Sequence, residues 1–192
     1  MEAIETFEAA GFTVSLYHDE DPGSPREWDN LGKMVCWHRR VNLGDETIKT
    51  SNYRNMDELV ASFNARVCIP LYLYEHGGMT MRTHPFGDPW DSGQVGFIYV
   101  TDETLRKEYS VPPGQDIPPE TLDLAKQVLV GEVETYDQYL TGDVYGYMVK
   151  DEAGEHVDSC WGFFGLEYAQ QEAEAALASA SNGKVDNESE VL

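Results

Sequence analysis

The residues best suited to chemistry in this 192-residue chain are concentrated in one short segment, from His18 to Arg40. The segment reads HDEDPGSPREWDNLGKMVCWHRR and holds two His, three Asp, two Glu and three Arg. Imidazole, carboxylate and guanidinium groups can bind metal ions, transfer protons or hold anions. We therefore expect a functional site in or beside this segment.

Binding of a divalent cation is one chemistry that the segment suggests. His18, Asp19, Asp21 and His38 supply the imidazole and carboxylate ligands that such a cation needs. None of the spacings HExxH, HxH or DxDxDG is present, so a site would depend on two strands meeting in space. The alternative is a solvated acidic loop in which Asp19 and Asp21 form side-chain turns next to Pro22.

The three arginines of the segment, Arg26, Arg39 and Arg40, form the one dense basic group of the chain. They can form a pocket for a carboxylate or a phosphate. Alternatively, they can hold the loop in a polar network with the carboxylates of the same segment, which are Asp19, Asp21 and Asp29.

A pocket of this kind would also recruit residues from further along the chain. His76 precedes a Gly-Gly turn, and Asp91 lies in the turn Asp91-Ser92-Gly93. The combined candidate ligand-binding residues are His18, Asp19, Asp21, Arg26, Asp29, His38, Arg39, His76 and Asp91. Four tryptophans lie next to polar residues or a cysteine and would either line a ring-binding pocket or fill the core: Trp28, Trp37, Trp90 and Trp161.

The elements that must position these residues follow from hydrophobic periodicity. Alternating or continuous apolar runs predict strands over 12–17, 33–38, 68–78, 79–86, 94–100, 142–151 and 156–165. Helical spacing and capping residues predict helices over 56–67, 101–110, 119–140 and 166–181. If the strands over 12–17 and 33–38 are neighbours, His18 and His38 come close together.

This order of elements, with more hairpins than crossovers, predicts an α+β fold. We expect a largely antiparallel β-sheet covered by helices on one side, in a single compact domain over residues 1–183. Residues 184–192 are polar and are predicted to form a disordered acidic tail.

The net charge of −22 restricts the class of partner. A field of this sign repels phosphates, so we expect no direct nucleic-acid binding and no attachment to anionic membranes. A basic protein or divalent cations would match it, although a strong net charge also simply favours solubility.

The sequence predicts a cytoplasmic protein. Its three cysteines are far apart and suggest no disulfide framework, its N-terminus lacks the pattern of a signal peptide, and no long apolar run is present. Cys36 and His38 stand two residues apart on one predicted strand face, an arrangement that nucleophilic catalysis could use, but the apolar run around Cys36 favours a core cysteine.

Several motifs resemble an uncharacterised family of hypothetical proteins from bacteriophages, prophages and conjugative elements. The similarity covers about residues 10–170 and lies in HDEDPGSPREWDNLG, MVCWHRR, PWDSGQVGFIYV, ETYDQYLTGDVYGY and DSCWGFFG. It implies a phage or mobile-element accessory protein that acts in the cytoplasm of the bacterial host.

Three hypotheses for function follow. The first is an accessory protein that binds a basic host protein through its acidic surface, modulating host defence or mimicking nucleic acid with carboxylates on the helices 119–140 and 166–181. The second is a metal- or anion-dependent enzyme or small-ligand binder that uses the His18–Arg40 polar pocket. The third is a structural phage protein. The sequence leaves the oligomeric state open.

Overall fold

The computed structural model describes the backbone of residues 2–189 and the side chains of residues 2–182. It confirms the α+β class, with helices and mostly antiparallel sheets. The chain is divided into two compact units: unit 1 comprises residues 1–23 and 141–192, and unit 2 comprises residues 24–140. Each unit has its own sheet and its own hydrophobic core.

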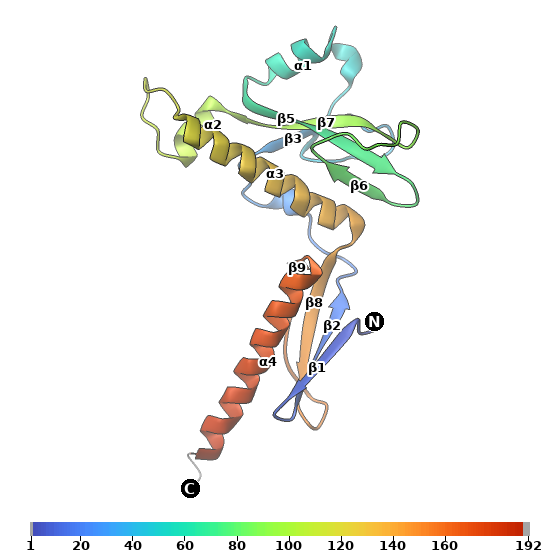
Figure 1. The fold of residues 1–192 in the computed structure, drawn as a ribbon, viewed down its shortest axis with the longest axis vertical. Helices are drawn as coiled ribbons and strands as arrows, with labels where there is room; N and C mark the ends of the chain where they lie inside the picture. Colours follow the sequence, from blue (N-terminus) through green and yellow to red (C-terminus); the bar gives the residue numbers. More distant parts are fainter. Residues whose placement is uncertain (1, 190–192) are drawn as a thin grey trace. The chain divides into compact units, whose positions relative to one another are not determined.

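Unit 1 is a four-stranded antiparallel sheet with one long helix packed on it (Figure 1). In sheet order the strands are β1 (Glu5–Ala9), β2 (Phe12–His18), β8 (Val144–Lys150) and β9 (His156–Phe164). The helix is α4 (Leu166–Ser189). Alternate residues of β2 and β8 point to this helix, whose small Ala169 and Ala173 let the backbones approach closely.

The sequence patterns missed β1, which forms a hairpin with β2. Ala9 pairs with Phe12, so only Ala10 and Gly11 make the turn, and both have positive φ, as a type I′ turn requires. Ala-Gly is an unusual pair for such a turn, and β1 is only five residues long. For these reasons the pattern did not distinguish it from a loop.

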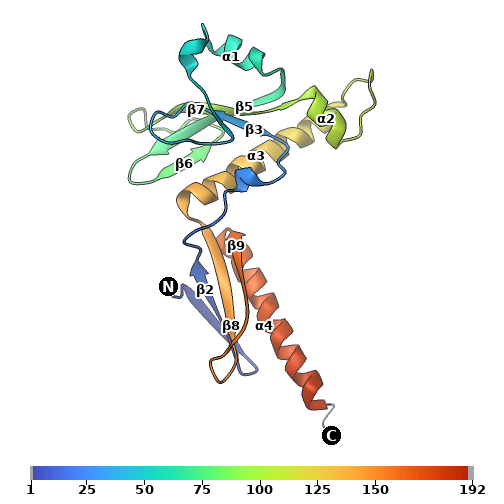
Figure 2. The same ribbon diagram turned by 180° about the vertical axis from the view of Figure 1, so that it is seen from behind.

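Unit 2 is a five-stranded sheet with helices on both faces (Figure 2). In sheet order the strands are β4 (Glu46–Thr47), β3 (Lys33–Cys36), β7 (Ser92–Thr101), β5 (Ala65–Glu75) and β6 (Met79–Arg82). The short β3–β4 pair is parallel and the other pairs are antiparallel. The helices are α1 (Met56–Ser62), α2 (Asp102–Glu108) and α3 (Pro119–Thr141), with short 3₁₀ turns at Pro25–Glu27 and Thr50–Asn52.

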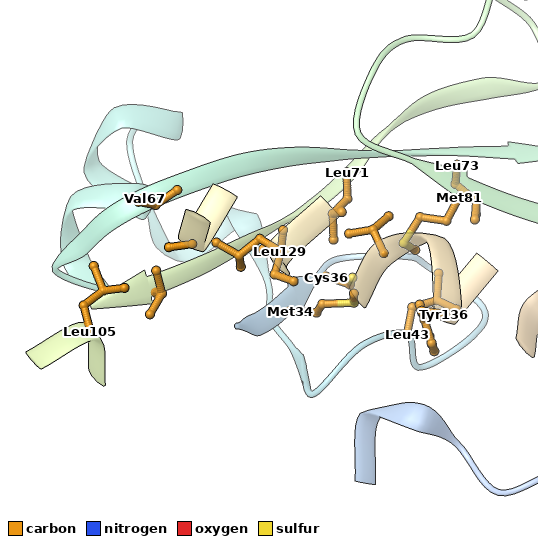
Figure 3. Close-up of a cluster of buried hydrophobic side chains, with 14 of the residues drawn as sticks. Met34, Cys36, Leu43, Val67, Leu71, Leu73, Met81, Leu105, Leu129 and Tyr136 are labelled. Carbon is orange, nitrogen blue, oxygen red and sulfur yellow. The ribbon is translucent and has the colours of Figure 1, made fainter. Parts of the chain in front are cut away.

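The larger core of unit 2 lies between the sheet and α3 (Figure 3). Met34 and Cys36 from β3 and Leu71 from β5 meet Leu129 and Tyr136 from α3 in this layer. Val35 and Phe97 alternate to the opposite face, where they pack with Leu59 of α1. The sheet is therefore buried on both faces, whereas the sequence predicted helices on one side.

One strand pairing considered from the sequence and two predicted helix ends differ from the structure. The strands over 12–17 and 33–38 are not neighbours, because β2 pairs with β1 and β8 while β3 pairs with β4 and β7. The helix predicted over 56–67 ends at Ser62, since Asn64 takes a positive φ and the chain then enters β5. The last helix continues to Ser189 rather than 181.

The tail predicted over 184–192 falls partly within α4. Its last residues, 190–192, lie outside the residues that the structure describes. No helix in the described part of the chain is both long enough and apolar enough to cross a membrane.

Candidate functional site

One end of the sheet in unit 2 brings several polar side chains together. Beyond the last β3–β7 pair, the Trp37 N–H donates to the Val95 carbonyl at 2.9 Å, which carries His38 to the start of β7. On the other side of β7, the Glu75 N–H donates to the Asp91 carbonyl at 2.8 Å. His38 and Glu75 therefore lie on opposite sides of the first residues of β7.

His38 is held from both ring nitrogens. Its Nδ1 accepts a hydrogen bond from the Val41 N–H at 3.2 Å, so in the neutral imidazole the proton is on Nε2. Nε2 lies 3.4 Å from a carboxylate oxygen of Glu75. The side chain is only 12% exposed. These contacts fix both the tautomer and the orientation of the ring.

Glu75 also binds Arg40. An Nη2 of Arg40 lies 2.7 Å from the second carboxylate oxygen of Glu75. The hydrogen bond from Arg40, together with its charge and that of His38 when protonated, lowers the pKa of Glu75 below its ordinary value. Glu75 is therefore a carboxylate at neutral pH, already contacted by the Arg40 guanidinium and the His38 imidazole.

A second imidazole–carboxylate pair stands beside the first. Nδ1 of His76 lies 2.9 Å from a carboxylate oxygen of Asp91. The turn before Asp91 is fixed by Asp88, whose Oδ1 accepts from the Trp90 N–H at 2.8 Å and the Asp91 N–H at 3.1 Å. These two backbone donors lower the pKa of Asp88.

These groups surround an open concavity of about 450 Å³ at the sheet end. Its polar and aromatic lining consists of His38, Arg39, Arg40, Glu75, Trp90, Asp91 and Ser92. The volume lies within the range of small-ligand sites. The indole of Trp90 is 91% exposed, the most exposed large apolar side chain in the described part of the chain. We refer to this concavity as the sheet-end site.

The sheet-end site contains part of the predicted set. His38, Arg39 and Asp91 line it, and His76 joins it through Asp91. Glu75 was missed because it reads as the last residue of an apolar strand, although its position beside the predicted His76 was a usable indication. Arg40 and Trp90 were noted in the sequence but not included among the candidates.

Arg26 has a structural role instead. Its guanidinium donates to Asp45 at 2.7 and 3.3 Å, to Glu132 at 2.9 Å and to the Gly32 carbonyl at 2.7 Å. Only 4% of the side chain is exposed. Although burial alone lowers its pKa, the hydrogen bonds and charges of the two carboxylates raise it above the ordinary value. A polar network was one of the alternatives, but the partners predicted for it were wrong.

The two carboxylates of this network also bind backbone amides. Glu132 accepts from the N–H groups of Leu31 at 2.8 Å and Gly32 at 3.1 Å, and Asp45 accepts from the Met34 N–H at 2.6 Å. The network therefore fixes the segment that leads into β3. Asp29 is exposed beside it and lines a separate concavity, so neither Arg26 nor Asp29 lies in the sheet-end site.

The remaining candidates belong to unit 1. The His18 ring packs 4.9 Å from that of Tyr145, measured between centroids. Oδ1 of Asp19 accepts from the Asp21 N–H at 3.2 Å, which is the local side-chain turn considered as an alternative to a metal site. His38, the fourth predicted metal ligand, lies in unit 2. Among the described residues, no three or more His, Cys, Asp and Glu side chains are grouped so as to hold a metal ion.

The cysteines are unpaired, but only Cys36 is buried, whereas Cys68 and Cys160 are exposed. Burial and the nearby carboxylate of Asp45 raise the pKa of Cys36 to about 12. Its thiol packs in the core beneath α3 and is neutral at physiological pH. Cys36 is therefore a core residue rather than a nucleophile.

Comparison with family models, with curated proteins and with solved structures finds no match to this chain. The site must therefore be interpreted from its own geometry and charge.

Proposed function

We propose that this protein acts by binding a basic protein partner through the acidic surface of unit 1. Unit 1 contains 17 acidic and 2 basic side chains, a net charge of −15, against 18 acidic and 11 basic in unit 2, a net charge of −7. Two thirds of the excess charge thus lies in the smaller unit. This segregation is the observation that supports the proposal.

The acidic side chains of unit 1 are placed for such contacts. Exposed carboxylates come from β1, from the β8–β9 turn and from α4, and include Glu8, Glu155, Glu167 and Glu174. Lys150 is the one basic side chain among the described residues of this unit, so few of these carboxylates can be neutralised within it. A cluster of Lys or Arg on a partner would supply the missing positive charge.

The structure supports a narrower acidic surface than the sequence suggested. On α3, Glu132 accepts from Arg26 and from two backbone amides. Asp137 accepts from the Thr80 hydroxyl at 2.7 Å and the Met81 N–H at 2.6 Å. These two carboxylates hold α3 against its own unit, so we place the partner surface on unit 1 alone.

In biological terms, we propose an accessory protein of a phage or other mobile element that binds a host protein involved in defence or nucleic-acid processing. A polyanionic surface that occupies a nucleic-acid site would be one form of this role. The resemblance of the sequence motifs and the charge of unit 1 support this role.

The test uses an arginine-rich peptide as a defined basic probe and a pull-down from bacterial lysate, each at low and high salt. We expect the affinity for the peptide to fall steeply with salt, because exposed charges are screened beyond about 8 Å at physiological ionic strength. A variant with Gln at positions Glu8, Glu155, Glu167 and Glu174 should lose most of the binding.

The matched control neutralises four exposed acidic residues of unit 2, namely Glu27, Glu46, Glu108 and Asp116. Both variants change the net charge equally, and circular dichroism verifies that each is folded. Equal loss of peptide binding in both variants, or none in either, would refute the assignment to unit 1.

A further inference from the structure

The sheet-end site combines two features that would recognise an aromatic anion. It offers an aromatic face that the fold does not bury and a guanidinium that the fold does not pair.

The backbone around Trp90 is fixed by hydrogen bonds, although the ring is exposed. The backbone N–H of Trp90 donates to Oδ1 of Asp88, the Ser92 hydroxyl donates to the Asp88 carbonyl, and the Glu75 N–H of β5 donates to the carbonyl of the next residue, Asp91. The indole itself is 91% exposed. It therefore offers an open aromatic face, on a fixed backbone, for a ligand ring to stack on.

Arg39 supplies the unpaired charge. It lines the same concavity, is exposed, and has no ion-pair partner among the described residues. Its neighbour Arg40 keeps further N–H donors free, because only its Nη2 binds Glu75. A guanidinium that is always charged and presents a planar fork is the side chain best suited to phosphate or carboxylate.

Both carboxylates of the site are contacted by side chains of the site itself. Glu75 is paired with the Arg40 guanidinium and lies beside His38, and a carboxylate oxygen of Asp91 lies 2.9 Å from Nδ1 of His76. Arg39 is therefore the guanidinium of the concavity that is left to bind an anion, even though the whole molecule is acidic.

We propose that the sheet-end site binds an aromatic anion, whose ring stacks on Trp90 and whose phosphate or carboxylate binds Arg39. A nucleotide or a carboxylated aromatic metabolite has this chemistry. The inference rests on unit 2 and is independent of the partner surface proposed for unit 1.

The experiment titrates the full chain with adenosine monophosphate, naphthoate, adenosine and inorganic phosphate, and measures heat of binding and tryptophan fluorescence. The first two probes separate a phosphate-bearing from a carboxylate-bearing ligand. The last two each lack one half of the recognised chemistry. We expect at least one aromatic anion to bind and to quench fluorescence, and its fragments to bind at least about tenfold more weakly.

Two variants and two controls locate the binding. Arg39→Gln and Trp90→Ala should each weaken binding of the aromatic anion by about tenfold or more. The first removes a charged hydrogen-bonding group, and the second removes a stacking face. Arg54→Gln and Trp28→Ala alter an exposed arginine and an exposed tryptophan of unit 2 outside the site, and should leave binding unchanged.

The proposal is overturned if neither aromatic anion binds, if phosphate alone binds as tightly as adenosine monophosphate, or if the Arg39 and Trp90 variants bind like the controls. The variant of unit 1 that lacks four carboxylates should still bind the aromatic anion. This result separates a failure of the sheet-end site from a failure of the unit 1 partner surface.

Discussion

Replacing Arg26 by Met should destabilise unit 2 more than any surface substitution. The Arg26 side chain is 4% exposed, and the side chains of its partners Asp45 and Glu132 are 15% and 10% exposed. Removing the guanidinium leaves two carboxylates in a poorly solvated position with their counter-charge gone. Breaking a buried ion pair on one side costs about 3–5 kcal/mol, and we expect a loss of that size in the free energy of unfolding.

The assay is urea denaturation followed by tryptophan fluorescence, because three of the four tryptophans, Trp28, Trp37 and Trp90, lie in unit 2. The matched control is Arg54→Met, which removes an arginine that is 89% exposed and lies 3.8 Å from Glu58. An exposed pair of this kind contributes at most about 1 kcal/mol.

Replacing both Asp45 and Glu132 tests whether the two uncompensated carboxylates cause the loss of stability. In a background of Asp45→Asn and Glu132→Gln, the change Arg26→Met should cost much less, because no uncompensated carboxylate is left behind. If Arg26→Met costs no more than the Arg54 control, the network does not stabilise unit 2 and the reasoning is wrong. An equal cost in both backgrounds would show that packing rather than charge accounts for the loss.

Three further predictions concern other parts of the chain. A Cβ at Gly146 would overlap the indole of Trp161, so Gly146→Ala should shift that ring and lower the melting temperature, as circular dichroism would show. Burial raises the pKa of Cys36 from 9.0 to about 12 in the folded protein. Between these pH values the Cys36 thiol ionises only in the unfolded chain. The free energy of unfolding should therefore fall with rising pH in this range, by up to about 1.4 kcal/mol per pH unit. In urea unfolding, the free energy of unfolding of the Cys36→Ala variant should fall less over this pH range. A fall as large as in the parent protein would contradict the raised pKa of Cys36. Asn55→Ala removes the cap of α1 and should cost about 1 kcal/mol in the same assay, whereas Asn55→Asp, which keeps the cap, should cost little.

Local patterns were sufficient where neighbours in sequence decide the structure. Asn55 caps α1 and Thr101 caps α2, since each side chain accepts a hydrogen bond from the backbone amide three residues on. The β8–β9 and β5–β6 hairpins and α3 also follow from turn residues and periodicity. The α+β class and the acidic surface charge were determined at this level.

Strand pairing was decided only by the tertiary structure. His18 and His38 would come close together only if the strands over 12–17 and 33–38 were neighbours, but the two ends of the segment from His18 to Arg40 enter different sheets. Hydrophobic alternation says which face of a strand is buried and nothing about which strand lies beside it, and a loop this long leaves the neighbour open. For the same reason Arg26 finds Asp45 and Glu132 rather than the carboxylates near it in sequence.

The composition of the sheet-end site shows the same division. The sequence identified His38, Arg39, His76 and Asp91 by residue type, and the antiparallel pairing of β3, β7 and β5 placed them at one sheet end. Glu75 and Trp90 acquire their significance only from that pairing, because the exposure of an indole and the partner of a carboxylate depend on which strands end together. The sequence determines which chemical groups the chain carries, whereas strand order and register determine which distant residues lie close together.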